Sequence, residues 1–141
     1  MILSNQSLFS NDQAVTATAV STNVIDTGEK GTPTWGTVAF AGDIGKGTPI
    51  PLEVVITEDF AGLTSLTIAV ETGATDALGT VLLTQTIAVD DLKVGKRLNF
   101  KVVPEGVQRF LGLKYTVVGT GTAGKVKAGI SHGGGNNVQG V

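Results

Sequence analysis

The stretch Leu66-Thr67-Ile68-Ala69-Val70-Glu71 alternates large apolar side chains with smaller or polar ones. Successive side chains of a β-strand point to opposite faces, so this period of two places Leu66, Ile68 and Val70 on one face. An amphipathic helix would instead repeat its apolar side chains three and four residues apart. The stretch therefore predicts a strand with one face in a hydrophobic core.

The same alternation recurs in four other stretches, which are residues 52–57, 97–102, 113–117 and 126–130. In the second of these, the apolar side chains are Leu98, Phe100 and Val102, which we expect in the core. The polar side chains between them include Arg97 and Lys101, and these are expected to face water or a partner. Helical periodicity is nearly absent from the chain.

Less regular strands are predicted in three further segments, 14–20, 37–40 and 80–89. Glycine, present in 20 copies, supplies tight turns because it adopts positive φ without steric strain. Such turns are expected in residues 28–33, 42–47, 59–62, 72–76 and 104–106. About eight short strands joined in this way are typical of a β-sandwich. The expected fold class is all-β, an antiparallel β-sandwich in the form of a jelly roll of about eight strands.

Three regions are expected along the chain: an N-terminal arm of residues 1–12, a sandwich of residues 13–131 and a glycine-rich tail of residues 132–141. The arm carries large apolar side chains with no clear strand or helix period, namely Ile2, Leu3, Leu8 and Phe9. In water they would form an apolar patch of the kind that marks an interface, so we expect them to contact a partner. The alternative, an arm that packs on its own sandwich as an edge strand, stays open.

The composition of the 141 residues excludes several classes of protein. With 41% apolar and 16% charged residues, the chain is too apolar to be intrinsically disordered. Cysteine is absent, so the fold uses no disulfide and no thiolate chemistry, which suits folding in a reducing cytoplasm. We expect no signal peptide and no membrane span, because no segment approaches the ~20 apolar residues that a transmembrane helix needs.

Charge is unevenly distributed along the sequence, although the net charge is only −2. Residues up to Asp91 include 11 acidic and two basic side chains, whereas the rest of the chain has one acidic and eight basic side chains. This asymmetry indicates an anionic partner, charge-complementary packing between subunits, or a sandwich in which the two halves interleave and their charges mix. Grooves for single-stranded nucleic acid interleave aromatic side chains with the basic ones, and aromatics are few here, so no nucleic-acid partner is expected.

Residues 119–124, Gly-Thr-Gly-Thr-Ala-Gly, match the dinucleotide-binding pattern G-x-G-x-x-G. That site requires a helix directly after the glycines, whose N-terminus faces the pyrophosphate. Residues 125–130 alternate like a strand, and no acidic residue follows to hold a ribose. The motif is therefore interpreted as a glycine-rich hairpin turn.

Catalytic and metal-binding signatures are weak. His132 is the only histidine and follows Ser131, without the carboxylate context of a catalytic triad. The paired acids Glu58-Asp59 and Asp90-Asp91 are neighbours in sequence, so on a strand they would point to opposite faces. A calcium site at one of these pairs is the alternative to a solvated edge. We expect no catalytic residue, no metal site and no cofactor.

The sequence resembles the capsid cement, or decoration, proteins of tailed bacteriophages of the Bordetella-phage type. The likeness is most evident in residues 1–10 (MILSNQSLFS), 13–19 (QAVTATA) and 21–26 (STNVID), and in the glycine-rich ending around 133–135. The resemblance implies a jelly-roll subunit that forms a homo-oligomer, a dimer or trimer, on the capsid exterior. It implies that the protein is made in the host cytoplasm, ties neighbouring major capsid proteins together and has no enzyme activity.

The resemblance carries no residue-level binding motif, so contact residues are inferred from side-chain chemistry. Trp35 lies in a predicted loop and is a candidate contact anchor, although it could equally cap the core. The candidate partner contacts are Ile2, Leu3, Leu8, Phe9, Trp35, Arg97 and Lys101.

Two functions other than that of a cement protein fit a β-sandwich. A carbohydrate- or receptor-binding β-sandwich of a virion is the alternative function, although one Trp and one Tyr offer few aromatic platforms for a sugar. A hydrolase on a cupin-type scaffold would bring a histidine-rich metal centre, against which the single histidine argues.

Overall fold

The structure is a computed structural model that describes residues 3–28, 34–35, 38–39, 49–102 and 106–131. Within these ranges the chain is all-β, and its one helix is the short 3₁₀ turn η1 (Val89–Asp91), so no helix is long and apolar enough to cross a membrane. The strands are β1 (Leu3–Ala14), β2 (Ala19–Val20), β3 (Ile25–Asp26), β4 (Thr34–Trp35), β5 (Val38–Ala39), β6 (Ile50–Gly73), β7 (Thr80–Ala88), β8 (Arg97–Val102) and β9 (Phe110–Ser131).

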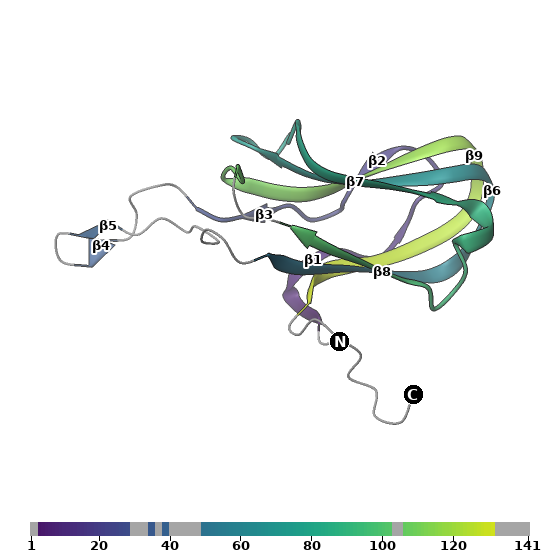
Figure 1. Ribbon diagram of the computed structural model, residues 1–141, viewed down its shortest axis with the longest axis horizontal. Helices are drawn as coiled ribbons and strands as arrows, with labels where there is room; N and C mark the ends of the chain where they lie inside the picture. The colour runs from purple at the N-terminus through teal and green to yellow at the C-terminus, as the bar shows by residue number, and fades with distance from the viewer. Residues whose placement is uncertain (1–2, 29–33, 36–37, 40–48, 103–105, 132–141) are drawn as a thin grey trace, which may run out of the picture.

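Two long antiparallel strands, β6 and β9, run through both layers of the sandwich (Figure 1). In the first layer, β1 pairs with residues 125–131 of β9. Residues 125–130 of β9 pair with residues 52–58 of β6, and residues 50–55 of β6 pair with β8. In the second layer, β2 and β3 pair with residues 110–115 of β9, and residues 65–72 of β6 pair with both β9 and β7. Successive strand segments of the sandwich cross between the layers except from β2 to β3 and at the β6–β7 hairpin, where both members lie in the second layer. This connectivity confirms the antiparallel jelly-roll sandwich expected from the alternation.

Bends within β6 and β9 allow each strand to pass from one layer to the other. The pairing register between them shifts repeatedly between Ile56 and Ser65, as it does at β-bulges. Gly119 and Gly124 adopt φ of 99° and 134°, a region that other residues rarely occupy. The interpretation of residues 119–124 as a hairpin turn, and of residues 59–62 as a turn, is therefore wrong. Both segments are bends inside continuous strands.

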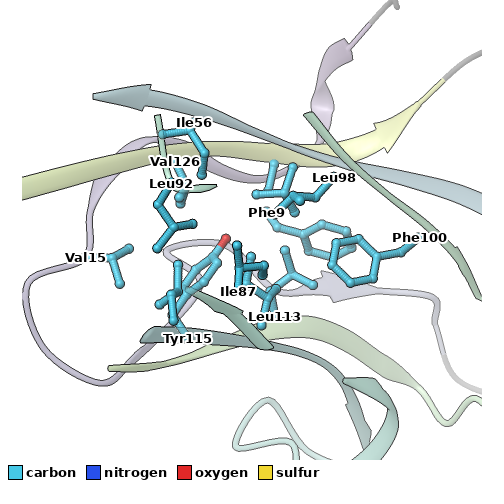
Figure 2. Packing of buried hydrophobic residues seen from close by; sticks show 14 of the residues in the cluster. Phe9, Val15, Ile56, Ile87, Leu92, Leu98, Phe100, Leu113, Tyr115 and Val126 are labelled. Atoms are coloured by element: carbon cyan, nitrogen blue, oxygen red, sulfur yellow. The ribbon is translucent and has the colours of Figure 1, made fainter. Parts of the chain in front are cut away.

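The core lies between the two layers and consists of the alternating apolar side chains (Figure 2). As expected, the apolar face of each half of β6 is buried. In the first layer it consists of Leu52, Val54 and Ile56, and in the second layer of Leu66, Ile68 and Val70. Leu98 and Phe100 of β8 are buried as well, while the side chain of Val102 lies outside the described residues. Tyr115 is fully buried and joins the two layers through a hydrogen bond between its hydroxyl and Ser10 Oγ (2.8 Å).

The N-terminal arm is corrected by the structure, because residues 3–12 belong to β1, an edge strand of the first layer. Leu8, Phe9 and Ser10 are buried one after another, and Phe9 has no exposed surface. Three register shifts along β1 interrupt the usual alternation, which is why these residues showed no strand period. The alternative of an edge strand on the same sandwich is the one observed.

Some of the other predicted strand positions agree with the structure and others do not. The strand expected at 80–89 corresponds to β7, whereas the one expected at 14–20 is wrong, since β1 ends at Ala14 and β2 begins at Ala19. Trp35, expected in a loop, lies in β4, which pairs only with β5 among the described strands. The tail of residues 132–141 lies outside the described residues.

Candidate interaction surfaces

The basic side chains of the first layer are largely neutralised by acids of the same layer. On its outer face Arg97 Nε lies 3.7 Å from Glu53 Oε1, Lys125 Nζ 2.7 Å from Glu58 Oε2, and Lys127 Nζ 3.6 Å from Asp12 Oδ2. The hydrogen bond between Lys125 and Glu58 lowers the pKa of the Glu58 carboxyl and raises the pKa of the Lys125 ammonium group. Among the described residues, Lys101 forms no ion pair on this face.

The same complementarity extends over the molecule. In the described chain, every ion pair joins an acid at or before Asp91 to a base beyond it, the others being Lys93–Asp59, Lys96–Asp91, Lys114–Glu71 and Arg109–Asp26. The lopsided charge of the sequence therefore reflects charge mixing within the sandwich.

The ion pair between Arg109 and Asp26 fixes β3 to β9 with two hydrogen bonds. Nε and Nη2 of Arg109 each donate to a carboxylate oxygen of Asp26 at 2.8 Å. The hydrogen bond from Arg109, with a further one from the Gly28 N–H, lowers the pKa of Asp26 to about 2. Such a bidentate pair adds geometric specificity to the attraction between charges.

The candidate contact residues are not brought together. Arg97 and Lys101 are exposed on the outer side of β8, whereas Leu3, Leu8 and Phe9 lie on β1, at the opposite edge of the same layer. Leu3 is half-buried, and Leu8 and Phe9 are buried in the chain's own core. The last two side chains are therefore not available to a partner. Ile2 and the side chain of Trp35 lie outside the described residues.

A surface that the sequence reasoning missed is the outer face of the second layer. Across three neighbouring strands, Thr116 of β9 opposes Thr67 of β6, which opposes Thr86 of the edge strand β7. The hydroxyls of Thr67 and Thr86 form a hydrogen bond of 2.8 Å. Cross-strand partners share a face, so this row lies opposite to the core side chains of the same strands.

Exposed valines surround this threonine row. Val118, Val20 and Val81 are 49%, 41% and 53% exposed, and they oppose Ser65, Lys114 and Glu71 on the same outer face. Lys114 and Glu71 pair with each other (3.9 Å), which leaves the face without net charge. We define the threonine face as Thr67, Thr84, Thr86, Thr116, Val20, Val81 and Val118. The sequence signal for this face lies in the residues that alternate with the core residues of each strand, such as Thr67 between Leu66 and Ile68.

The described residues do not assemble a cluster of metal-binding side chains. No group of three or more His, Cys, Asp or Glu side chains converges in this part of the chain. Calcium was the alternative ligand for the paired acids Glu58-Asp59 and Asp90-Asp91. Three of these four carboxylates form ion pairs with lysines instead: Glu58 with Lys125, Asp59 with Lys93 and Asp91 with Lys96. Burial raises the pKa of the Tyr115 hydroxyl above its usual range, so this phenol stays protonated.

The fold is that of an all-β sandwich of the jelly-roll type. A family model, Bbp16, matches residues 9–130, and the chain belongs to this family. The family name is that of a Bordetella phage protein, which indicates a phage protein and a structural component of the virion. A search of curated proteins finds no match.

Proposed function

We propose that this protein binds the outside of a bacteriophage capsid and stabilises the shell by bridging neighbouring major capsid proteins. The observation that carries the proposal is the threonine face, a broad sheet surface of short side chains without net charge. Family membership supports the phage context, and the resemblance to cement proteins supports the position on the capsid.

The threonine face has the physical properties of a protein-binding surface. The cores of protein interfaces are depleted in charged residues, and this face has one lysine and one glutamate that pair with each other. Thr and Val lose little side-chain entropy when they are covered, in contrast to long, flexible side chains. Exposed Val20, Val81 and Val118 supply apolar area that a partner can remove from water.

The basic edge of the first layer offers a second, electrostatic contact. Lys101 forms no ion pair within the described residues, and Arg97 lies on the same side of β8, 3.7 Å from Glu53. An acidic surface of a capsid protein would find Lys101 here, with the ion-paired Arg97 beside it. Such rim charges contribute more to association rate and orientation than to affinity. Trp35 and Ile2 are kept as candidate contacts on the grounds of their chemistry.

Cement action follows from mass action and needs no catalysis or cofactor. A protein that binds the assembled shell but not free subunits stabilises the shell by the free energy of that binding. If several copies are linked into an oligomer, each added contact is intramolecular, so modest affinity for each site is sufficient. In contrast, a sugar-binding function would need exposed aromatic rings, and the only tyrosine, Tyr115, is fully buried.

Co-sedimentation of the purified protein with capsid shells that lack it tests the proposal. We expect saturable binding to assembled shells and none to free capsid subunits, together with a higher temperature of shell disruption. Thr116→Arg places a long charged side chain in the centre of the threonine face and should weaken binding about tenfold or more. Thr75→Arg, in the exposed turn after β6, is the matched control and should bind like the parent.

Two outcomes would count against these assignments separately. No saturable binding to any shell would contradict the cement function. Shell binding that is equal for the parent, Thr116→Arg and Thr75→Arg would leave the function standing but would remove the threonine face from the contact.

A further inference from the structure

Strand β7 forms a free edge of the second layer. It pairs with β6 along residues Thr80–Ala88, and no other described strand pairs with its far side. Alternate residues of an edge strand direct their N–H and C=O groups away from the sheet, where they can bond another strand. Most of the strand is exposed, including Leu83 (38%) and Val81 (53%), two of the five large apolar side chains exposed in the described chain.

The other edges of the sandwich carry features that discourage strand addition, and β7 does not. β1 contains Asp12 and three register shifts, and β8 contains Arg97 and Lys101. β2 and β3 are only two residues long. β7, with the sequence TVLLTQTIA, is nine residues long, has no charge, proline or glycine, and keeps one register with β6 from Leu83 to Ala88. Natural proteins protect long, uncharged edges of this kind unless the edge is used for pairing.

We propose that β7 pairs antiparallel with β7 of a second copy of this chain, so that the second layers of two subunits form one continuous sheet. The inference rests on the proposed function and deepens it, since it names the interface that makes the oligomer. The oligomer is tested without any capsid, so failure of one proposal is distinguishable from failure of the other.

A second copy fits this edge because β7 is complementary to itself. Two-fold symmetry brings each residue opposite one from the same face of the same strand, and no like charges meet because the strand has none. Opposed side chains would be Thr, Gln and aliphatic residues, which pair well across strands. The symmetry also continues the threonine face from one subunit into the next, which doubles the surface that could span two capsid proteins.

Sedimentation velocity of the full chain tests the interface. We expect a dimer for the parent protein and an increase of about tenfold or more in the dissociation constant for Gln85→Lys, because a lysine on an edge strand blocks strand addition. Gln85 is exposed, so the variant should keep the parent circular dichroism spectrum. Asn99→Lys adds the same charge to the exposed edge strand β8 of the other layer and should stay dimeric.

Engineered cysteines give a second measurement that does not depend on weakening the interface. The chain has no cysteine, so a disulfide in a single-cysteine variant can only join two copies. We expect at least one of Thr84→Cys, Gln85→Cys and Thr86→Cys to form a dimer efficiently on oxidation with diamide, and Asn99→Cys not to. A parent protein that is monomeric at its highest soluble concentration would overturn the inference. So would a Gln85→Lys variant that dimerises like the parent, or equal cross-linking at Asn99.

Discussion

At the scale of single residues, one polar network links the N-terminal strand to the second layer. Ser10 Oγ donates to Gln13 Oε1 (2.7 Å) and accepts from the Tyr115 hydroxyl, and Gln13 Nε2 donates to the Val20 carbonyl. The network joins β1, β2 and β9, and its bond between Ser10 and Tyr115 is buried in the core, whereas its bond from Gln13 to Val20 is exposed. A buried hydroxyl without a partner destabilises a fold more than a hydrogen bond stabilises it.

The two ends of this hydrogen bond should therefore respond differently to substitution. Ser10→Ala leaves the Tyr115 hydroxyl buried without its partner and should lower the free energy of unfolding by about 1–3 kcal/mol. Tyr115→Phe removes the hydroxyl itself while Ser10 keeps its bond to Gln13, so a loss of about 0.5–1.5 kcal/mol is expected. Urea melts of both variants give the comparison. A larger loss for Tyr115→Phe than for Ser10→Ala would show that the network is assigned wrongly.

The ion pair between Asp26 and Arg109 predicts a pH dependence of stability at acidic pH. Asp26 has a pKa of about 2 in the folded protein against 3.8 for an unperturbed aspartate. Because the folded-state pKa is the lower one, the stabilisation is complete above the unperturbed value and is lost as the pH falls through about 2. Asp26→Asn should be less stable than the parent at neutral pH, and this difference should shrink between about pH 4 and pH 2.

Chemical denaturation across this pH range measures the difference directly. Asp76→Asn, in the exposed turn after β6, serves as the control for a carboxylate elsewhere on the surface. A gap between the parent and Asp26→Asn that stays constant from pH 7 to pH 2 would contradict the role of the ion pair.

At the scale of elements, the bends of β6 and β9 allow each of these strands to pair in both layers of the sandwich. Gly124 (φ 134°) lies at the bend of β9, and a Cβ on it would lie 2.3 Å from Cδ1 of Phe60 on β6. Gly79 has a similar φ of 137°, but a Cβ there would meet nothing within 4 Å. Substitution of Gly79 therefore causes backbone strain alone, whereas substitution of Gly124 causes backbone strain and a steric clash.

Gly124→Ala should consequently be clearly more destabilising than Gly79→Ala. Both substitutions strain the backbone by about 1–2 kcal/mol, and Gly124→Ala adds overpacking of about 1–3 kcal/mol against Phe60. Denaturant melts of the two variants test this order. Equal losses would mean that Phe60 can move aside and that the bend does not depend on the close approach of the two strands.

The first strand is a structural element of the sandwich, so its removal should destroy the fold. Deletion of residues 1–9 removes Leu8 and Phe9 from the core and exposes the edge of β9. The milder Phe9→Ala should cost about 3–5 kcal/mol, as other large-to-small core substitutions do. Asn5→Ala, at an exposed position of the same strand, is the control. A truncated protein that melts near the parent temperature would restore the view of a separate arm.

Regular strands could be predicted from the sequence because their register follows from local alternation. Leu66, Ile68 and Phe100 were expected in the core and are buried there. β1 could not be predicted in this way, since its register shifts depend on how Ser10 and Gln13 meet β9. The glycines of residues 119–124 permit either a hairpin turn or a bend, and only the distant pairing with β6 decides between them.

At the scale of the whole molecule, the sequence could not show which surfaces remain open. Phe9 was expected to contact a partner because it is apolar, and this prediction is wrong because the sandwich itself buries that side chain. The threonine face could not be predicted, because it becomes one surface only when β2, β6, β7 and β9 lie side by side in the second layer. Charge mixing likewise depends on tertiary pairing, as Lys127 and Asp12 show across 115 positions of sequence at 3.6 Å.

The most direct measurement of the central claim is a pair of cryo-electron microscopy reconstructions of the phage head, with and without this protein. The account predicts that the difference between them is density on the outer surface, between neighbouring capsid subunits. The jelly roll should fit this density with its threonine face toward the shell. Identical reconstructions, or density confined to the inside of the head or to the tail, would contradict a cement function.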